Sequence, residues 1–182
     1  MTTLWRTILF AAAALITAPA LAQATSNAIS ECEPGQLSTS NPPGPDGGAG
    51  NSASVFQVIN ASRQTCILTG VPKLRLLDEQ GKPFNLSICP NCADYIFPAK
   101  PIKTITLHPE DAAHFLIGLR FADASELRCG RLSRVEVLLD DGASSLKFGF
   151  AGLRVCGKID VSGWRTDVYT DAELQRDPAG GE

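Results

Sequence analysis

Apolar residues at every second position most constrain how this chain folds. The alternating runs are separated by short turns rich in Asn, Asp, Gly and Pro. They cover residues 55–60, 74–76, 104–107, 115–121, 135–139, 146–150 and 159–161. Such alternation is typical of strands that bury one face and expose the other. No long amphipathic helix interrupts the runs, so the sequence predicts an all-β antiparallel sandwich.

One of these runs also predicts where a histidine lies. Phe115, Ile117 and Leu119 share a face, and His114 lies on the opposite face. We therefore expect His114 on a solvated strand surface. A single turn of helix is expected just after this run, at residues 123–127.

The first 24 residues have the layout of a secretory signal peptide. Arg6 carries the positive charge, residues 8–16 are apolar, and small residues follow Pro19 up to expected cleavage after Ala22 or Ala24. An apolar segment this short does not span a bilayer, which needs about 20 residues. We expect a periplasmic or secreted protein with no membrane insertion after signal cleavage.

Six cysteines follow the expected cleavage site. An even number of cysteines in an oxidising compartment predicts a disulfide framework. Six cysteines allow many connectivities, and spacing does not select one of them. The hypothesis that we favour pairs Cys32 with Cys66, Cys89 with Cys92, and Cys129 with Cys156.

The 182 residues predict one β-sandwich domain at residues 25–165. Within it, residues 34–54 are rich in Gly and Pro and predict a long loop, because they lack the spacing of a nucleotide-binding motif. Residues 166–182 hold five acidic residues against one basic and predict a flexible acidic tail. With 16 basic and 19 acidic residues overall, we expect no nucleic-acid partner.

Cys89-Pro-Asn-Cys92 is the sharpest local motif. A Cys-x-x-Cys pair acts as a redox couple when a helix N-terminus or a nearby cation stabilises one thiolate. Here the strand-like residues 84–88 precede the pair, Asp94 follows it, and residues 95–98 show no helical pattern. These features favour a structural disulfide over a redox couple.

The same cysteines are spaced from the two histidines as in some zinc sites. Fifteen residues separate Cys92 from His108, and five separate His108 from His114. Pro109 excludes the helix from which a zinc finger presents its histidines, and an oxidised cysteine pair offers no thiolates. We therefore expect no metal and no cofactor, and keep Cys89, Cys92, His108 and His114 as the alternative site.

Enzyme signatures are missing from the sequence. It contains no Gly-x-Ser-x-Gly motif for a nucleophilic serine, and its two histidines flank a single turn. The acidic pairs Glu110-Asp111 and Asp140-Asp141 lie in expected turns, where acidic side chains cap the backbone. Trp164 and Tyr169 allow two interpretations: stacking on a sugar or, for Trp164, closing the core. We expect no catalytic residue.

Part of the chain resembles a family of secreted bacterial proteins, domain of unknown function 4232. The features that carry the resemblance are, in order, Cys32, the Gly-rich loop to Gly50, the block Asn60-Ala-Ser-Arg-Gln-Thr-Cys66-Ile-Leu-Thr-Gly-Val-Pro72, Cys129 and Cys156. The resemblance reaches as far as Trp164. It implies an immunoglobulin-like sandwich of about seven to eight strands with disulfides and without established catalytic residues. Cys89 and Cys92 are an addition to the family pattern.

Together these observations predict an exported, non-catalytic β-sandwich module that binds or interacts in the cell envelope. The expected partner is an envelope protein or a glycan. The alternative is a zinc or thiol-redox site on Cys89 and Cys92 with His108 and His114.

Overall fold

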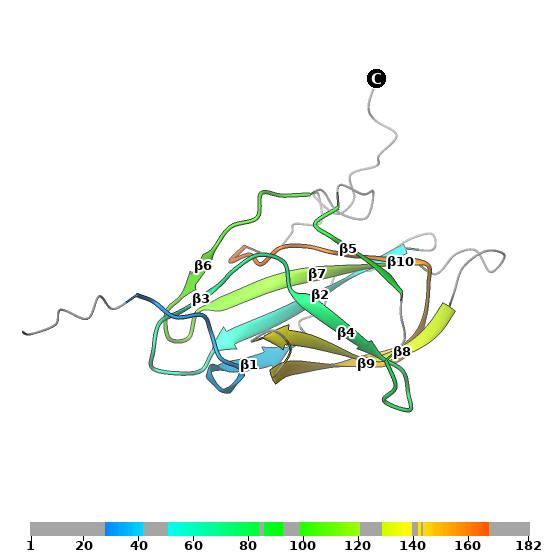
Figure 1. The fold of residues 1–182 in the computed structure, drawn as a ribbon, viewed down its shortest axis with the longest axis horizontal. Helices are drawn as coiled ribbons and strands as arrows, with labels where there is room; N and C mark the ends of the chain where they lie inside the picture. Colours follow the sequence, from blue (N-terminus) through cyan, green and yellow to red (C-terminus); the bar gives the residue numbers. More distant parts are fainter. Residues whose placement is uncertain are drawn as a thin grey trace, which may run out of the picture.

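The computed structural model describes residues 28–41, 51–83, 86–92, 99–120, 129–139, 142 and 144–167. Within these ranges there are ten strands, one short 3-10 turn and no α-helix (Figure 1). The elements are η1 (Pro34–Gln36), β1 (Leu37–Ser40), β2 (Asn51–Asn60), β3 (Cys66–Leu68), β4 (Lys73–Leu77), β5 (Ser87–Pro90), β6 (Ile105–Leu107), β7 (Ala112–Arg120), β8 (Cys129–Leu139), β9 (Ser144–Cys156) and β10 (Lys158–Val161).

The strands form two layers and a small additional sheet. β1, β2, β7, β10 and β5 lie side by side in that order, and β4, β8 and β9 form a second sheet. Figure 1 shows the second sheet beneath the first, with the β3–β6 pair at one end. β10 pairs antiparallel with β7 and parallel with β5. The all-β sandwich is confirmed, with more strands than the seven to eight expected.

Aromatic side chains from both layers form the centre of the core. Phe56 of β2 and Phe115 of β7 are fully buried and stack with their ring centroids 5.1 Å apart. Phe148 of β9, in the opposite layer, meets Phe56 edge-on at 5.1 Å. Trp164 packs edge-on against Phe115 at 5.0 Å. Trp164 therefore closes one side of the core, which is one of the two roles that the sequence allowed.

The segment predicted as a loop, residues 34–54, carries regular structure at both ends. η1 and β1 lie within it, and β2 begins at Asn51 rather than Val55. Residues 42–50 lie outside the described part of the chain. β1 pairs with the end of β2, where Leu37 lies opposite Asn60. The Leu-Ser-Thr-Ser sequence of β1 has one apolar residue, so it shows no alternation from which a strand is predicted.

The central strand β7 departs from the predicted one-sided pattern. All of residues 113–119 are buried, and His114 is only 7% exposed. The prediction that His114 lies on a solvated surface is therefore wrong. β7 lies between β2 and β10 in the sheet, and both of its faces are covered. A strand of this kind buries polar residues that an alternating pattern assigns to solvent.

Several expectations fall on residues outside the described ranges. They are the signal peptide at residues 1–24, the helical turn at residues 123–127, and the acidic tail beyond Asp167. Among the described residues, no helix is long and apolar enough to cross a membrane.

Candidate functional site

Disulfides join all six cysteines. The pairs are Cys32–Cys66, Cys89–Cys92 and Cys129–Cys156, the same pairs that the sequence hypothesis favoured. The first and third pairs connect separate segments, and Cys129 lies directly opposite Cys156 across the β8–β9 pair. The second pair joins cysteines only three positions apart at the end of β5.

The Cys89–Cys92 disulfide lies at the edge of the five-stranded sheet, because β5 is its last strand. Cys89 is the direct neighbour of Asp160 across the parallel β5–β10 pair. The Asp160 carboxylate is 1% exposed and lies 3.2 Å from the Lys158 ammonium. The two sulfurs and a carboxylate oxygen of Asp160 all lie within 4.8 Å of one another. The sequence gives no signal for this arrangement, because Asp160 is far from the cysteines along the chain.

The structure does not bring the four residues of the alternative zinc site into one cluster. His108 follows β6 and is exposed. Cys89 pairs with Asp160 of β10, which pairs with Gly118 of β7, and His114 lies four residues before Gly118. Four residues of a strand span about 13 Å, so His114 is at least that far along the strand from the position level with Cys89. Among the described residues, the potential ligand that approaches Cys89 and Cys92 is Asp160. The disulfide in this structure also leaves the two sulfurs without the thiolates that zinc binds.

His114 belongs instead to a buried polar group. Its Nε2 lies 2.9 Å from the amide nitrogen of Gln57, whose amide oxygen accepts a 2.6 Å hydrogen bond from Ser40. Because an amide nitrogen donates, Nε2 of His114 accepts and the ring proton lies on Nδ1. Burial lowers the pKa of His114, Asp167 opposes this shift, and Arg165 adds to it. The folded protein therefore favours the neutral ring.

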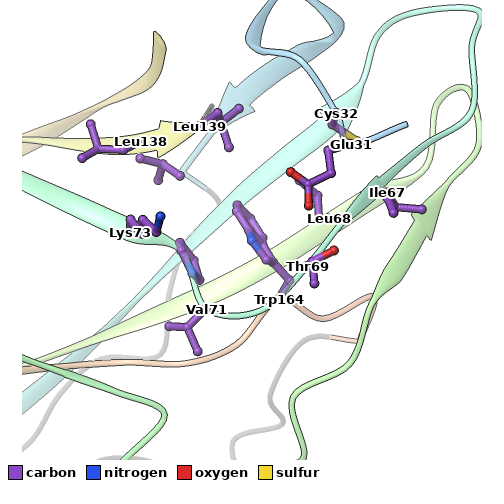
Figure 2. Close-up of a pocket in the computed structure, with 12 residues that line it drawn as sticks. Glu31, Cys32, Ile67, Leu68, Thr69, Val71, Lys73, Leu138, Leu139 and Trp164 are labelled. Carbon is purple, nitrogen blue, oxygen red and sulfur yellow. The ribbon is translucent and has the colours of Figure 1, made fainter. Parts of the chain in front are cut away.

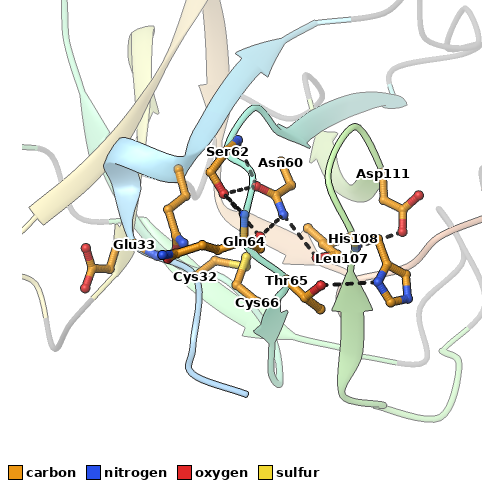
Figure 3. Close-up of a disulfide and its surroundings, with 11 residues drawn as sticks. Cys32, Glu33, Asn60, Ser62, Gln64, Thr65, Cys66, Leu107, His108 and Asp111 are labelled. Carbon is orange, nitrogen blue, oxygen red and sulfur yellow. Dashed lines mark hydrogen bonds between the residues drawn. A yellow bond between two sulfur atoms is a disulfide. The ribbon is translucent and has the colours of Figure 1, made fainter. Parts of the chain in front are cut away.

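Asn60, the first residue of the family block, organises the turn that precedes β3 (Figure 3). Its side-chain nitrogen donates to the carbonyl groups of Gln64 and Leu107, at 2.7 and 3.0 Å. Its side-chain oxygen accepts from both the backbone amide and the hydroxyl of Ser62. Asn60 is fully buried beside the Cys32–Cys66 disulfide. This part of the family block is therefore structural.

The carboxylates of one expected acidic turn have the capping role that the sequence predicted. Asp111 accepts a 2.9 Å hydrogen bond from the backbone amide of His108, and the two residues also close the turn through their backbones. Glu110 has a φ of 71° within this turn and is exposed. The other acidic pair, Asp140-Asp141, lies outside the described residues.

A cleft of about 530 Å³ opens beside Trp164 (Figure 2). Nine of its lining residues have apolar side chains, although polar atoms provide more of its accessible surface than apolar atoms do. The polar side chains are Glu31, Thr69 and Lys73, and the apolar lining residues are Cys32, Ile67, Leu68, Val71, Pro72, Val137, Leu138, Leu139 and Trp164. They come from four segments that are far apart in the sequence: residues 31–32, residues 67–73, residues 137–139 at the end of β8, and Trp164. Of these residues, the sequence marked Cys32 as a disulfide cysteine and Trp164 as a candidate for stacking on a ligand.

Trp164 also borders a second cavity of about 390 Å³. Its rim carries Lys100, Lys103 and Arg165, and Arg165 forms an ion pair with Asp167, which is also part of the lining. This ion pair offsets part of the positive charge at the rim. The first cleft is the larger of the two, and Cys32 of the disulfide framework lies in its wall, so we take it as the stronger candidate for a ligand site.

The comparisons with known proteins agree with this geometry in outline. The family model described as "Domain of unknown function (DUF4232)" matches residues 32–165. This range begins at the first cysteine of the framework and ends directly after Trp164. No curated protein and no solved structure matches the chain.

Proposed function

The chain belongs to the DUF4232 family of domains of unknown function, and we propose that it is an exported, non-catalytic binding module whose ligand enters the cleft beside Trp164. The observation that carries this proposal is the cleft itself. Its volume of about 530 Å³ falls within the range of small-molecule and side-chain sites, and nine of its lining residues have apolar side chains.

The lining also indicates the chemistry of the ligand. Trp164 is only 5% exposed, so the half-buried side chains Val71 and Leu138 offer more apolar contact surface in the lining than its ring does. Lys73 and Glu31 supply opposite charges that would orient a polar group of the ligand. The lining has three polar side chains, which are few partners for the several hydroxyls of a sugar, and an unpaired buried hydroxyl is costly. We therefore favour an apolar group, such as a hydrophobic side chain of an envelope protein, over a glycan.

Two observations support export to the cell envelope. The first residues have the pattern of a signal peptide, and three disulfides form in an oxidising compartment. The disulfide-linked scaffold would hold the cleft walls in place, because Cys32 is itself part of the lining. A pre-formed site loses little conformational entropy when its ligand binds.

The fluorescence of Trp164 tests this proposal directly. The chain has two tryptophans, so a Trp5→Phe background leaves Trp164 as the reporter. Anilinonaphthalene sulfonate, an apolar ring system with one negative charge, is the probe. We expect saturable energy transfer from Trp164 at one probe per chain. Thr69→Phe fills the cleft and is expected to weaken binding about tenfold or more, equivalent to about 1.4 kcal/mol.

Ser38→Phe is the matched control, because it adds the same ring on an exposed position of β1 away from the cleft. This variant should bind the probe as the unmodified chain does. Equal binding by the Thr69→Phe and Ser38→Phe variants would contradict the cleft as the site. Displacement of the probe by triacetylchitotriose, an uncharged glycan, would contradict the preference for an apolar group.

A further inference from the structure

We propose that Cys89–Cys92 is an exchangeable disulfide that accepts two electrons from a dithiol of a partner protein, with the Asp160 carboxylate carrying the proton. The observation behind this proposal is a buried carboxylate, ion-paired with the half-buried Lys158, beside a disulfide at a sheet edge. This site is separate from the cleft at Trp164.

The position of the disulfide gives a partner thiolate access. β5 is the edge strand, and its residues Ile88 and Pro90 are exposed. Cys89, Cys92 and Cys129 are half-buried and the other three cysteines are buried, so Cys89–Cys92 is the pair in which both cysteines are partly exposed. Thiol–disulfide exchange requires a thiolate to reach a sulfur, so exposed disulfides are the labile ones.

The carboxylate of Asp160 is placed to move a proton to these sulfurs. One of its oxygens lies within 4.8 Å of both sulfurs, a separation that one water molecule bridges. On the other side of Asp160, β7 presents Gly118, which has no side chain. Lys158 holds the carboxylate through a 3.2 Å ion pair and offsets its negative charge, which would otherwise oppose a thiolate at the neighbouring sulfurs.

A purely structural clip does not account for the buried carboxylate. Burying the Asp160 carboxylate costs free energy that its attraction to the half-buried Lys158 only partly offsets. An apolar residue at position 160 of the interior strand β10 would stabilise the sheet at least as well.

The exchange balances in two steps. One thiol of the partner gives its proton to the Asp160 carboxylate, and the resulting thiolate attacks one sulfur of the Cys89–Cys92 pair. The S–S bond breaks, and the second cysteine leaves as a thiolate that takes this proton from Asp160. The second partner thiol then loses its proton to the Asp160 carboxylate and attacks the mixed disulfide. The first cysteine leaves as a thiolate and takes that proton. The partner dithiol is oxidised to a disulfide, and Cys89 and Cys92 become thiols.

Stepwise reduction of the native full-length chain is the first test. Dithiothreitol, a small dithiol, is added at rising concentration, and free thiols are alkylated and located by mass spectrometry. We expect Cys89 and Cys92 to be labelled at least tenfold lower in dithiothreitol than the other four cysteines. Reduction of all three disulfides together would overturn the proposal.

Asp160→Asn separates proton transfer from structure. We expect this variant to slow exchange with dithiothreitol about tenfold or more and to flatten its pH dependence, because the amide cannot carry a proton. Glu136→Gln is the matched control, since Glu136 is also a buried carboxylate paired with a cation, Arg75, at 3.3 Å. It should leave the exchange rate and its pH profile unchanged.

Lys158→Gln is a second variant that tests the proposal if Asp160→Asn does not fold. This variant retains the carboxylate and removes the cation, and we expect slower exchange with a preserved pH profile. Unchanged exchange in the variants that fold would overturn the roles of Asp160 and Lys158. Tight binding of one zinc ion by the reduced chain, in place of reoxidation, would overturn the redox role in favour of a metal site.

Discussion

The Cys32–Cys66 and Cys89–Cys92 disulfides each lie beside an asparagine, and the two regions differ in how firmly that residue is held. Asn60 is fully buried beside Cys32–Cys66, and its side chain makes four hydrogen bonds. Asn91 lies between the other two cysteines with a φ of 50°, is half-buried, and donates one 3.0 Å side-chain hydrogen bond to the Lys100 carbonyl.

The two regions are also well separated along β7. Asn60 hydrogen-bonds to the backbone of Asp111, just before β7, whereas Cys89 is level with Gly118 across β10. These levels are seven residues apart, or about 23 Å along the strand. A similar combination of a disulfide and an asparagine therefore forms a buried clamp at one end of the sheet and an accessible loop near the other. Cys32–Cys66 is buried and Cys89–Cys92 is not, which is why we propose exchange at the second pair.

Removing each disulfide should give the largest difference between the two regions. In the chain-entropy description, a bridge across 34 positions contributes about 4 kcal/mol and one across three positions about 2 kcal/mol. We therefore expect Cys32→Ala/Cys66→Ala to lose about 2 kcal/mol more stability than Cys89→Ala/Cys92→Ala. Urea unfolding monitored by circular dichroism measures both. Equal losses would show that the edge disulfide is as structural as the buried one.

Replacing the two asparagines sharpens the comparison at the level of single side chains. Asn60→Ala removes the side-chain partner of the buried Leu107 carbonyl, of the Gln64 carbonyl and of the Ser62 amide and hydroxyl, and we expect a loss of about 3 kcal/mol. Asn91→Gly removes one half-buried hydrogen bond and keeps a residue that adopts positive φ, so its expected loss is about 1 kcal/mol or less.

The same urea unfolding experiment measures the asparagine variants. A larger loss for Asn91→Gly than for Asn60→Ala would contradict the view that the Cys32–Cys66 region is the firmer clamp. Asn41→Ala is a further control, because Asn41 is exposed and makes a single 2.9 Å hydrogen bond to the Gly149 carbonyl. Its expected effect is within about 1 kcal/mol.

Lowering the pH should cause the smallest loss of stability, and this loss should affect the whole five-stranded sheet rather than one disulfide region. Burial holds the pKa of His114 below its ordinary value, so the unfolded chain binds a proton before the folded chain does. The stabilising contribution of the neutral His114 is complete above about pH 6.5 and falls as the pH drops toward the pKa of His114 in the folded state. One proton limits the slope to about 1.4 kcal/mol per pH unit.

Thermal unfolding between pH 7.5 and 5.5 measures this slope, and His114→Gln should flatten it. Asp167 and Arg165 face the ring with opposite effects on its pKa, so a modest slope is expected. The order in which the two disulfides are reduced should stay the same across this range. A reversal of that order at low pH would link His114 to one region rather than to the sheet as a whole.

Sequence reasoning succeeded where a residue's role depends on its near neighbours. Alternation around Phe115 and Phe148 predicted strands whose apolar faces form the core, and Pro109-Glu-Asp predicted a turn. It failed at His114, because burial of the second face of β7 depends on packing that no local pattern encodes. It also missed Asp160, whose role depends on the pairing of β5 with β10.

The sequence by itself determined the fold class and the two kinds of motif: alternating strands, and a block from Asn60 to Cys66 beside an added Cys-x-x-Cys pair. Both are local properties, since side-chain alternation and turn chemistry act over a few residues. Only the tertiary structure decided which cysteine pair is buried, and which charges lie beside the other. The tertiary structure alone also brought four distant segments together as the cleft at Trp164. Burial and contacts between distant strands depend on packing, which a linear pattern does not contain.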